Sequence, residues 1–175
     1  NVKGKTLDIG CGSKPYEELF INSNEYIGIE IDTPETRKKN QTDYFYDGSV
    51  FPFNDNEFDS IVANQVFEHV FNPCGFLKEI NRVMKTGGTL LLTVPFVWDE
   101  HEQPYDYARY SSFGIKHLFQ NHGFEISEQK KSINDIRVIF QLLNCYIYKK
   151  ALPKNIFLKS LFAFILISPI NLLGT

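Results

Sequence analysis

The sequence predicts an α/β fold with a doubly wound, mostly parallel sheet, helices on both faces and apolar helices at the C-terminal end. Short apolar runs alternate with segments of helical spacing, which favours parallel strands joined by helices. The run at 89–94 is continuously apolar, as is typical of a strand buried on both sides. The first run, at 5–9, ends directly in a Gly-x-Gly turn.

The chain has 175 residues, and 43% of them are hydrophobic, which suffices for one domain with a real core. We expect residues 1–133 to form a ligand-binding domain and residues 134–175 to be an apolar helical extension of it. The net charge of −3 gives no indication of a nucleic-acid partner. The three cysteines show no metal-ligand spacing, and we expect no metal site.

The elements follow from periodicity and from the residues that end each run. A short helix is expected around 16–20, and Gly87-Gly88 is expected to end the helix at 74–84. The predicted strands are 5–9, 26–32, 43–46, 58–63, 89–94 and 124–130. The predicted longer helices are 74–84, 112–121, 135–150 and 155–173.

The turn Gly10-Cys11-Gly12 lets backbone approach a ligand and is followed by N–H groups of the next helix. Glu30 ends the next strand, about 20 residues on, where a carboxylate can accept both ribose hydroxyls. This pattern indicates a Rossmann-like nucleotide site. Pro15 stands where a dinucleotide site needs a third small residue, which disfavours NAD.

Six segments in order resemble class I S-adenosylmethionine-dependent methyltransferases, specifically the methyltransferase type 11 group. The resemblance covers roughly residues 5–131. The matching segments are Leu7-Asp8-Ile9-Gly10-Cys11-Gly12, Gly28-Ile29-Glu30, Asp47-Gly48, the run 51–59, Asn64-Gln65-Val66-Phe67-Glu68-His69-Val70 and the run 76–90. One departure is Ser13-Lys14-Pro15, where the family often has a further glycine.

The resemblance implies S-adenosyl-L-methionine as cofactor, with S-adenosyl-L-homocysteine as product, bound by residues 1–133. Asp8 would face the ligand's ammonium group, and Glu30 would take the ribose hydroxyls. The full expected set is Asp8, Gly10, Gly12, Glu30, Ile31, Asp47, Gly48, Asn64 and Gln65. For Asp47 and Gly48 the alternative roles are a cap and a turn; for Asn64 and Gln65 a ligand role and a structural role are equally favoured.

The segment 99–112 follows the fifth strand and concentrates titratable and aromatic side chains. It resembles a pattern in methyltransferases of bacterial surface-glycan clusters, which implies a small-molecule or glycan acceptor. His101 is the expected catalytic base, because its intrinsic pKa suits proton transfer, and Glu102 or Asp106 would orient it or hold sugar hydroxyls. The expected acceptor-binding residues are Tyr107, Arg109 and Tyr110. The alternative is structural, with Arg109 in a salt bridge and the tyrosines packed as a lid; His69 is expected to be a structural histidine near the cofactor.

The tail is apolar and free of acidic residues, since all 21 lie at or before Asp135. Two interpretations stand: the tail packs on the domain or on a second subunit of an oligomer, or residues 149–173 contact an anionic membrane surface. The first is favoured, because most apolar helices are buried in protein. This class usually has a seventh strand, and the sequence up to Thr175 predicts none.

The sequence thus predicts a cytoplasmic methyltransferase, or one at the inner membrane face, that O-methylates a carbohydrate or glycan-linked intermediate. A small metabolite or lipid-like acceptor is the second interpretation. A non-catalytic binding module that kept the fold is the third, and the intact Gly10, Gly12, Glu30 and Asp47 set argues against it.

Overall fold

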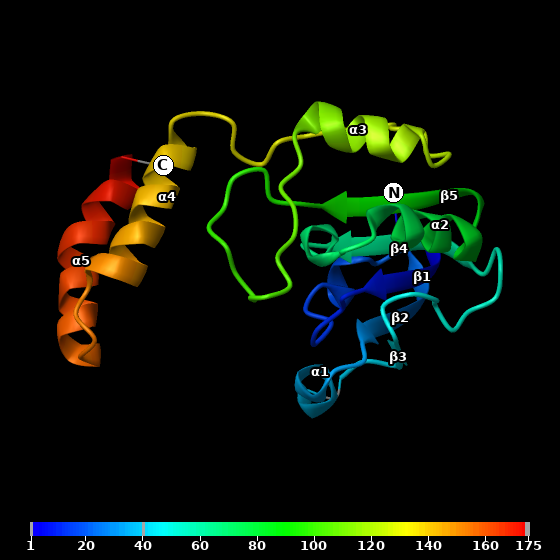
Figure 1. Cartoon of the computed structure of the whole chain (residues 1–175), viewed down its shortest axis with the longest axis horizontal. Coiled ribbons are helices and arrows are strands. Elements are labelled where there is room, and N and C mark those ends of the chain that lie inside the picture. Colours follow the sequence, from blue (N-terminus) through cyan, green and yellow to red (C-terminus); the bar gives the residue numbers. More distant parts are fainter. Residues whose placement is uncertain (1, 40, 174–175) are drawn as a thin grey trace. The chain divides into compact units, whose positions relative to one another are not determined.

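The computed structural model describes residues 2–39 and 41–173, and these divide after Ser127 into two compact units. The first unit contains a five-stranded parallel sheet in the order β3-β2-β1-β4-β5 (Figure 1). The predicted α/β class with a parallel sheet is confirmed. The division after Ser127 precedes the boundary expected after residue 133.

The strands lie close to the predicted ranges. They are β1 Gly4–Ile9, β2 Ser23–Ile31, β3 Tyr44–Tyr46, β4 Phe58–Asn64 and β5 Met84–Thr93. β1 lies at the centre of the sheet, where Asp8 pairs with Gly28 on β2 and with Val62 on β4. Because all strands run in parallel, their carboxyl ends meet at one edge, which is where open α/β sheets bind ligands.

Alternation along the strands separates the two faces of the sheet. Leu7 and Ile9 lie on one face of β1, and both are fully buried against α2, Pro73–Val83, and α3, Ser112–Gln120. Thr6 and Asp8 lie on the opposite face and are also buried. The hydrophobic core between the sheet and these helices consists of Leu7, Ile9, Ile27, Ile29, Phe51, Phe58, Ile61, Ala63, Phe67, Phe76, Leu77, Ile80, Val83 and Phe119.

The start of α2 follows standard capping chemistry, whereas its end differs from the prediction. The Asn72 side chain accepts a hydrogen bond from the Gly75 N–H at 3.1 Å. The helix ends at Val83 and β5 begins at Met84, so Gly87-Gly88 lie inside the strand and not at a helix cap. A Cβ on Gly88 would lie 3.1 Å from the Asp59 carbonyl oxygen, which explains a glycine in the strand by close backbone approach.

The predicted sixth strand is wrong. Residues 124–130, all described, form no strand. The alternation that suggested it is real, because Phe124 and Ile126 both pack against the core. The Phe124 ring contacts Phe119 of α3 at 5.4 Å between centroids. Side-chain packing therefore holds this segment without the ladder of backbone hydrogen bonds that defines a strand.

The shorter helical elements connect the strands. A 3₁₀ turn, Glu17–Leu19, lies in the expected short-helix region, and α1, Pro34–Lys39, follows β2. A second 3₁₀ turn, Phe67–His69, follows β4. In the second unit, α4 is Arg137–Tyr146, a π-helical turn covers Ile147–Ala151, and α5 is Ile156–Leu173.

Within the second unit, the two predicted helices pair with each other. The Asn144 side chain of α4 donates to that of Asn171 on α5 at 2.6 Å. The Lys159 ammonium lies 3.9 Å from the centroid of the Tyr148 ring, a cation–π contact. Among the described residues, none of the helices combines the length and the apolar character needed to cross a membrane.

Candidate ligand-binding and catalytic site

The glycine turn at the end of β1 is held in a conformation that requires glycine at its first position. Gly10 has φ +69°, and a Cβ there would lie 2.4 Å from Cγ2 of Val66. The Gly10 N–H donates to the Ile29 carbonyl oxygen at 2.9 Å, which ties the turn to β2. Val66 follows β4, so the turn is packed between the carboxyl ends of three strands.

The structure brings together Glu30 and Gly12, two of the residues expected at the cofactor site. The Gly12 N–H donates to Oε1 of Glu30 at 2.6 Å, so the carboxylate lies against the glycine turn. A Cβ on Gly12 would meet no atom within 4 Å, so the space above this residue is open. A partly buried carboxylate therefore borders a glycine-lined opening at the edge of the sheet.

The Asp8 side chain is buried beneath the glycine turn and is not exposed on the protein surface. It is 3% exposed and accepts a hydrogen bond from the Tyr26 hydroxyl at 2.8 Å. Burial raises the pKa of Asp8 to about 6, although the Tyr26 bond acts in the opposite direction. A cationic group nearby would favour the ionised carboxylate and so restore a low pKa.

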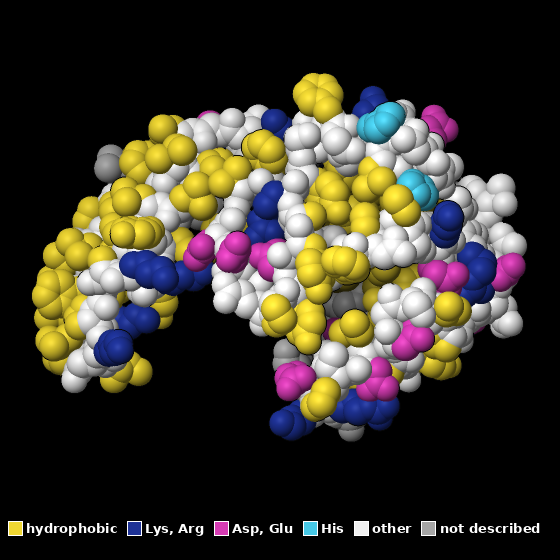
Figure 2. Space-filling model, viewed as in Figure 1, with side chains coloured by type: hydrophobic (Ala, Val, Ile, Leu, Met, Phe, Trp, Pro, Cys, Tyr) yellow, Lys and Arg dark blue, Asp and Glu magenta, His cyan; other side chains and the backbone are white. Residues whose placement is uncertain are grey.

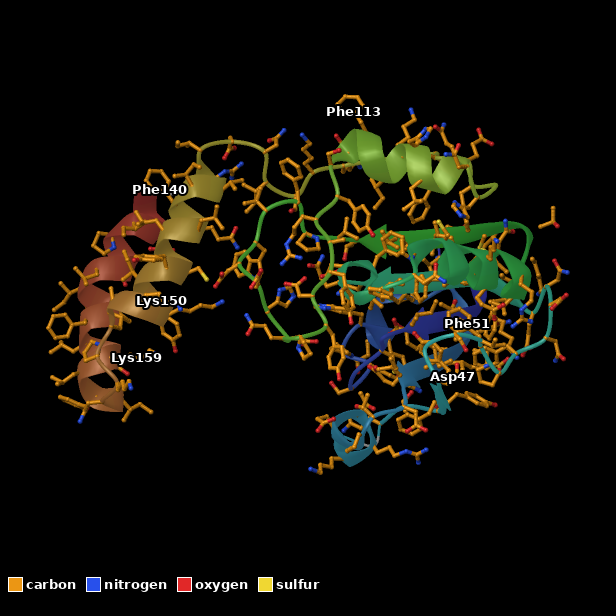
Figure 3. The ribbon with its side chains drawn as sticks, in the orientation of Figure 1. Asp47, Phe51, Phe113, Phe140, Lys150 and Lys159 are labelled. Carbon is orange, nitrogen blue, oxygen red and sulfur yellow. The ribbon has the colours of Figure 1, made fainter. Side chains whose placement is uncertain are left out.

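Ile31 and Gly48 meet at the outer part of this edge, and Asp47 lies beside them. A Cβ on Gly48 would lie 3.4 Å from Cδ1 of Ile31. Asp47 is exposed, in the segment between β3 and β4 (Figure 3). Its Oδ1 accepts from the Ser49 N–H at 2.8 Å and the Val50 N–H at 3.2 Å. These bonds, with one from the Ser49 hydroxyl, lower the pKa of Asp47, and the contacts to the two N–H groups are of the capping kind weighed for this residue from the sequence.

Asn64 and Gln65 are both tied to Thr93, at the end of β5. The Gln65 N–H donates to the Thr93 carbonyl oxygen at 3.1 Å, and Oδ1 of Asn64 accepts from the Thr93 hydroxyl. A pocket opens beside these residues. It is lined by Tyr16, Leu19, Phe20, Val62, Ala63, Asn64, Leu91 and Thr93.

Two residues of this edge were missed from the sequence. Asp43 accepts a hydrogen bond from the Gly28 N–H at 2.7 Å and pairs with the Lys14 ammonium. Lys14 thereby bridges the glycine turn and the start of β3. An acid directly before a strand and a lysine in place of a family glycine were the available signals, but only the fold brings them together.

Residues 99–112, called the acceptor segment here after the role predicted for them, pack on the turn that follows β4. The N–H groups of Tyr107 and Ala108 donate to the Glu68 carbonyl oxygen at 2.9 and 3.2 Å. Nδ1 of His69 lies 2.7 Å from the Tyr105 carbonyl oxygen. The segment 64–69 therefore contacts the glycine turn through Val66 and the acceptor segment through Glu68 and His69.

His101, Asp106 and Arg109 form one charged cluster in this segment. Arg109 holds both Asp106 oxygens, at 2.6 and 2.7 Å, which is the ion pair of the structural alternative. The guanidinium holds the pKa of the buried Asp106 carboxyl well below its usual range. Nδ1 of His101 lies 3.3 Å from Oδ2 of Asp106, so the carboxylate also orients the imidazole.

The two predicted tyrosines pack on rings of the domain, as a lid would. Tyr110 lies 5.0 Å from Phe67 between ring centroids, and Tyr107 lies 5.2 Å from Phe71. Glu102 is exposed, and its backbone carbonyl accepts from Tyr105 at 3.0 Å. Of the three predicted catalytic residues, His101 and Asp106 are therefore in contact, whereas the Glu102 side chain lies outside their cluster.

Glu68 is the residue at this site that sequence reasoning passed over. Its side chain is fully buried, and neither carboxylate oxygen has a hydrogen-bond partner among the described residues. Burial raises the pKa of Glu68. Oε1 lies 3.9 Å from Nε2 of His69, whose ring contacts that of His101 at 4.8 Å between centroids. The sequence showed Glu68 beside His69, but the approach of His101 depends on the fold.

Residues 7–92 match the sequence model of a family described as a methyltransferase domain. Demethylmenaquinone methyltransferase of Staphylococcus saprophyticus is 30% identical over 105 residues, covering 52% of this chain and 45% of that protein. Cycloartenol-C-24-methyltransferase 1 of rice is 31% identical over 111 residues, covering 56% and 32%. The chain thus spans less than half the length of these curated relatives.

Solved structures share the fold. An S-adenosylmethionine-dependent methyltransferase from Mesorhizobium loti has a TM-score of 0.58 at 11% identity, covering 79% of this chain and 82% of that one. An S-adenosylmethionine-dependent methyltransferase from Aquifex aeolicus has a TM-score of 0.55 at 20% identity, covering 73% of this chain and 77% of that one. At these low sequence identities the similarity supports the fold alone, and the chemistry has to be inferred from the residues at the site.

Proposed function

We infer the function of this chain from the membership of its residues 7–92 in the methyltransferase-domain family. We propose that it binds S-adenosylmethionine and methylates a hydroxyl group of a carbohydrate or glycan-linked acceptor. The observation that carries the proposal is the Glu30 carboxylate held 2.6 Å from the Gly12 N–H, beside an open glycine turn. This combination offers acceptors for ribose hydroxyls at the edge where parallel sheets bind nucleotides.

The chain's residues fit that cofactor. The opening above Gly12 leaves space for the methionine part, and Glu30 has a second carboxylate oxygen for the ribose. Ile31 and Gly48 form an apolar contact suited to the face of an adenine ring. Asp8 supplies a negative charge beneath the turn for a cationic ligand. Bound S-adenosylmethionine would supply a methyl group activated by its sulfonium.

A calorimetric titration tests the cofactor. S-adenosylhomocysteine should bind, whereas NAD should give no heat, because Pro15 replaces the small residue that a pyrophosphate requires. Glu17→Gln, on the 3₁₀ turn beside the site, serves as a control for loss of a nearby charge and should bind S-adenosylhomocysteine normally. Binding of NAD without S-adenosylhomocysteine would refute the proposal.

His101 is our proposed base for the acceptor hydroxyl. Its Nδ1 lies 3.2 Å from the Asp99 carbonyl oxygen and 3.3 Å from Oδ2 of Asp106, both acceptors, and 3.4 Å from Nη2 of Arg109, a donor; we assign the proton to Nδ1 from the two shorter contacts. Nε2 is then the nitrogen that takes the hydroxyl proton as the new carbon–oxygen bond forms. Asp106 fixes the tautomer and stabilises the imidazolium that results. Tyr107, Tyr110 and Arg109 line the acceptor side in this proposal.

The test is a methyl-transfer screen over nucleotide sugars, lipid-linked glycans and small acids, read by mass spectrometry. With the acceptor found, His101→Ala should lower turnover about 10²–10⁴-fold and leave the affinity for S-adenosylhomocysteine unchanged. His117→Ala, on α3, is the matched control and should keep full turnover. Full turnover of His101→Ala would remove this residue from the mechanism.

A small metabolite or lipid-like acceptor is the second candidate. Two relatives carry names that refer to demethylmenaquinone and cycloartenol, both apolar molecules. Apolar rings beside the acceptor segment, such as Phe71 at 82% exposure, would suit such a substrate. Including a quinol and a sterol in the same screen decides between the acceptors. Absence of transfer to every acceptor, with S-adenosylhomocysteine bound, would favour a binding module.

We also propose that residues 149–173 contact an anionic membrane surface, where a lipid-linked glycan would be found. Apolar side chains remain exposed on the helical pair, including Phe157 at 78% and Phe164 at 74% (Figure 2). Lysines accompany them, among them Lys150 and Lys159 (Figure 3). Each lysine near an anionic surface contributes roughly 1 kcal/mol.

Co-sedimentation with vesicles tests the membrane contact. Anionic vesicles should bind the chain more than neutral ones at low salt, and the difference should fade at high salt. Lys150→Gln combined with Lys159→Gln should weaken binding, whereas Lys116→Gln with Lys131→Gln, outside the tail, is the charge-matched control. Equal binding to both vesicle types would rule out the electrostatic contribution. Assembly of a second copy over the same side chains would appear as a dimer in solution.

A further inference from the structure

The turn after β4 and the acceptor segment bring three metal-ligating side chains together. Glu68, His69 and His101 each offer one ligand atom, and these atoms all lie within 4.8 Å of one another. Two of the residues are neighbours in sequence, whereas the third arrives from a segment more than thirty residues away. Two imidazoles and one carboxylate are a ligand set that first-row transition metals use in proteins.

Glu68 provides an independent indication of a missing partner. Its side chain is fully buried, and both oxygens lack a hydrogen-bond partner among the residues that the structure describes. A buried carboxylate without such partners is costly, and native proteins normally satisfy it with a donor or a cation. Oε1 instead faces Nε2 of His69 at 3.9 Å, too long for a hydrogen bond, and the nearby Arg109 guanidinium attracts the carboxylate without forming a hydrogen bond to it.

Both histidines present the correct nitrogen for coordination. Nδ1 of His69 lies 2.7 Å from the Tyr105 carbonyl oxygen, which can only accept, so the proton is on Nδ1 and the Nε2 lone pair is free. We assign the Nδ1 proton of His101 in the same way, because its two shorter contacts are with acceptors, the Asp99 carbonyl oxygen and the Asp106 carboxylate, whereas Nη2 of Arg109, a donor, lies 3.4 Å away. Metal-bound histidines characteristically donate their second N–H to a carbonyl or a carboxylate.

We propose that Glu68, His69 and His101 bind a divalent first-row transition cation of the Zn²⁺ type. Bonds of about 2.0–2.2 Å in tetrahedral geometry place ligand atoms about 3.3 Å apart, so the three side chains draw together on binding. The His101 side chain is 28% exposed and belongs to the acceptor segment, which gives it room to move. Mg²⁺ and Ca²⁺ are disfavoured, because they prefer oxygen ligands.

The cation would have one or more positions left for an acceptor oxygen. Three protein ligands with an open position are the arrangement of catalytic zinc sites, whereas structural sites are closed by four. In this state Nε2 of His101 is a ligand, and the cation lowers the pKa of a bound acceptor hydroxyl. Metal binding itself does not depend on the proposed methyl transfer, so the two can fail separately.

The experiment is direct titration of the full chain. The protein is stripped with EDTA, dialysed and titrated with Zn²⁺ by calorimetry and against a chromophoric chelator. We expect one tight site per chain, with protection against thermal unfolding. Glu68→Gln, His69→Gln and His101→Gln should each weaken Zn²⁺ binding at least about tenfold, since even residues that only orient metal ligands matter by that factor. His117→Gln, on α3, removes a histidine elsewhere and should bind like the wild type.

The outcomes separate clearly. Tight stoichiometric binding that is lost in the three variants and kept in His117→Gln supports the site. No stoichiometric Zn²⁺ binding, or equal affinity in Glu68→Gln and wild type, overturns it. If Glu68→Gln fails to fold, His101→Gln in the more exposed acceptor segment carries the test. If the chain binds Zn²⁺ but methyl transfer continues after a chelator has removed the ion, the metal site is still supported, and the proton transfer is assigned to His101 without the metal.

Discussion

Replacing Asp8 by asparagine tests how the chain carries a buried charge beneath its glycine turn. The folded-state pKa of Asp8 is about 6, and the unfolded-state value is about 3.9. Above pH 6 the carboxyl group is ionised in both states, and the folded state bears the cost of burying the charge. Two pKa units at 1.36 kcal/mol each make this cost about 3 kcal/mol.

The direction in which stability changes with pH follows from the number of protons that the folded and unfolded states bind. Between pH 4 and pH 6 the folded chain holds a proton that the unfolded chain has released, so wild-type stability falls as pH rises. Asp8→Asn lacks this titration. The free energy of unfolding of the variant, relative to the wild type, should therefore rise by about 2.4 kcal/mol between pH 4 and pH 8, since the full value of about 3 kcal/mol is reached only from a pH well below the unfolded-state pKa. An unsatisfied amide N–H would shift all values equally, so the change with pH is the diagnostic quantity.

Urea unfolding followed by fluorescence of the single tryptophan, Trp98, measures this difference across the pH range. Asp32→Asn is the control, because its pKa is lowered by a hydrogen bond from Arg37 and not raised by burial. That variant should show a smaller dependence of the opposite sign. A stability difference between Asp8→Asn and wild type that is independent of pH would refute the reasoning.

Three further predictions concern the same unit. Glu30→Ala should weaken S-adenosylhomocysteine binding by about 1–3 kcal/mol in calorimetry, because hydrogen bonds to a charged acceptor are lost. Gly10→Ala should lower the free energy of unfolding, measured in urea, by about 2–4 kcal/mol, because the new Cβ clashes with a neighbouring valine and the backbone has a left-handed φ. Gly12→Ala should lower it by only about 1–2 kcal/mol, because only the left-handed φ is unfavourable there. Asp106→Asn should lower stability by about 1–3 kcal/mol and raise proteolysis of the acceptor segment, because it breaks the bidentate pair with Arg109.

Local patterns sufficed for most of the elements. The five strands of the sheet and the two tail helices lie near their predicted ranges, because the periodicity of apolar residues over a few positions predicts each of them. Two predictions failed where the pattern had another cause. Gly88 marks a close backbone approach inside β5, and the apolar residues Phe124 and Ile126 reflect side-chain packing against the core.

The sequence by itself determined the α/β class and the order of strand, glycine turn and acid-ended strand, because these features are defined within about twenty residues, whereas the hydrogen bond between Gly12 and Glu30 comes from the structure. Only the tertiary structure decided that Thr93 holds Asn64, that the rings of His69 and His101 meet, and that Glu68 is buried without a hydrogen-bond partner among the described residues. Such contacts join residues from different strands and loops, and burial depends on everything packed around a side chain. No local pattern encodes either quantity, so Glu68, His69 and His101 become a cluster only once the acceptor segment lies against the turn after β4.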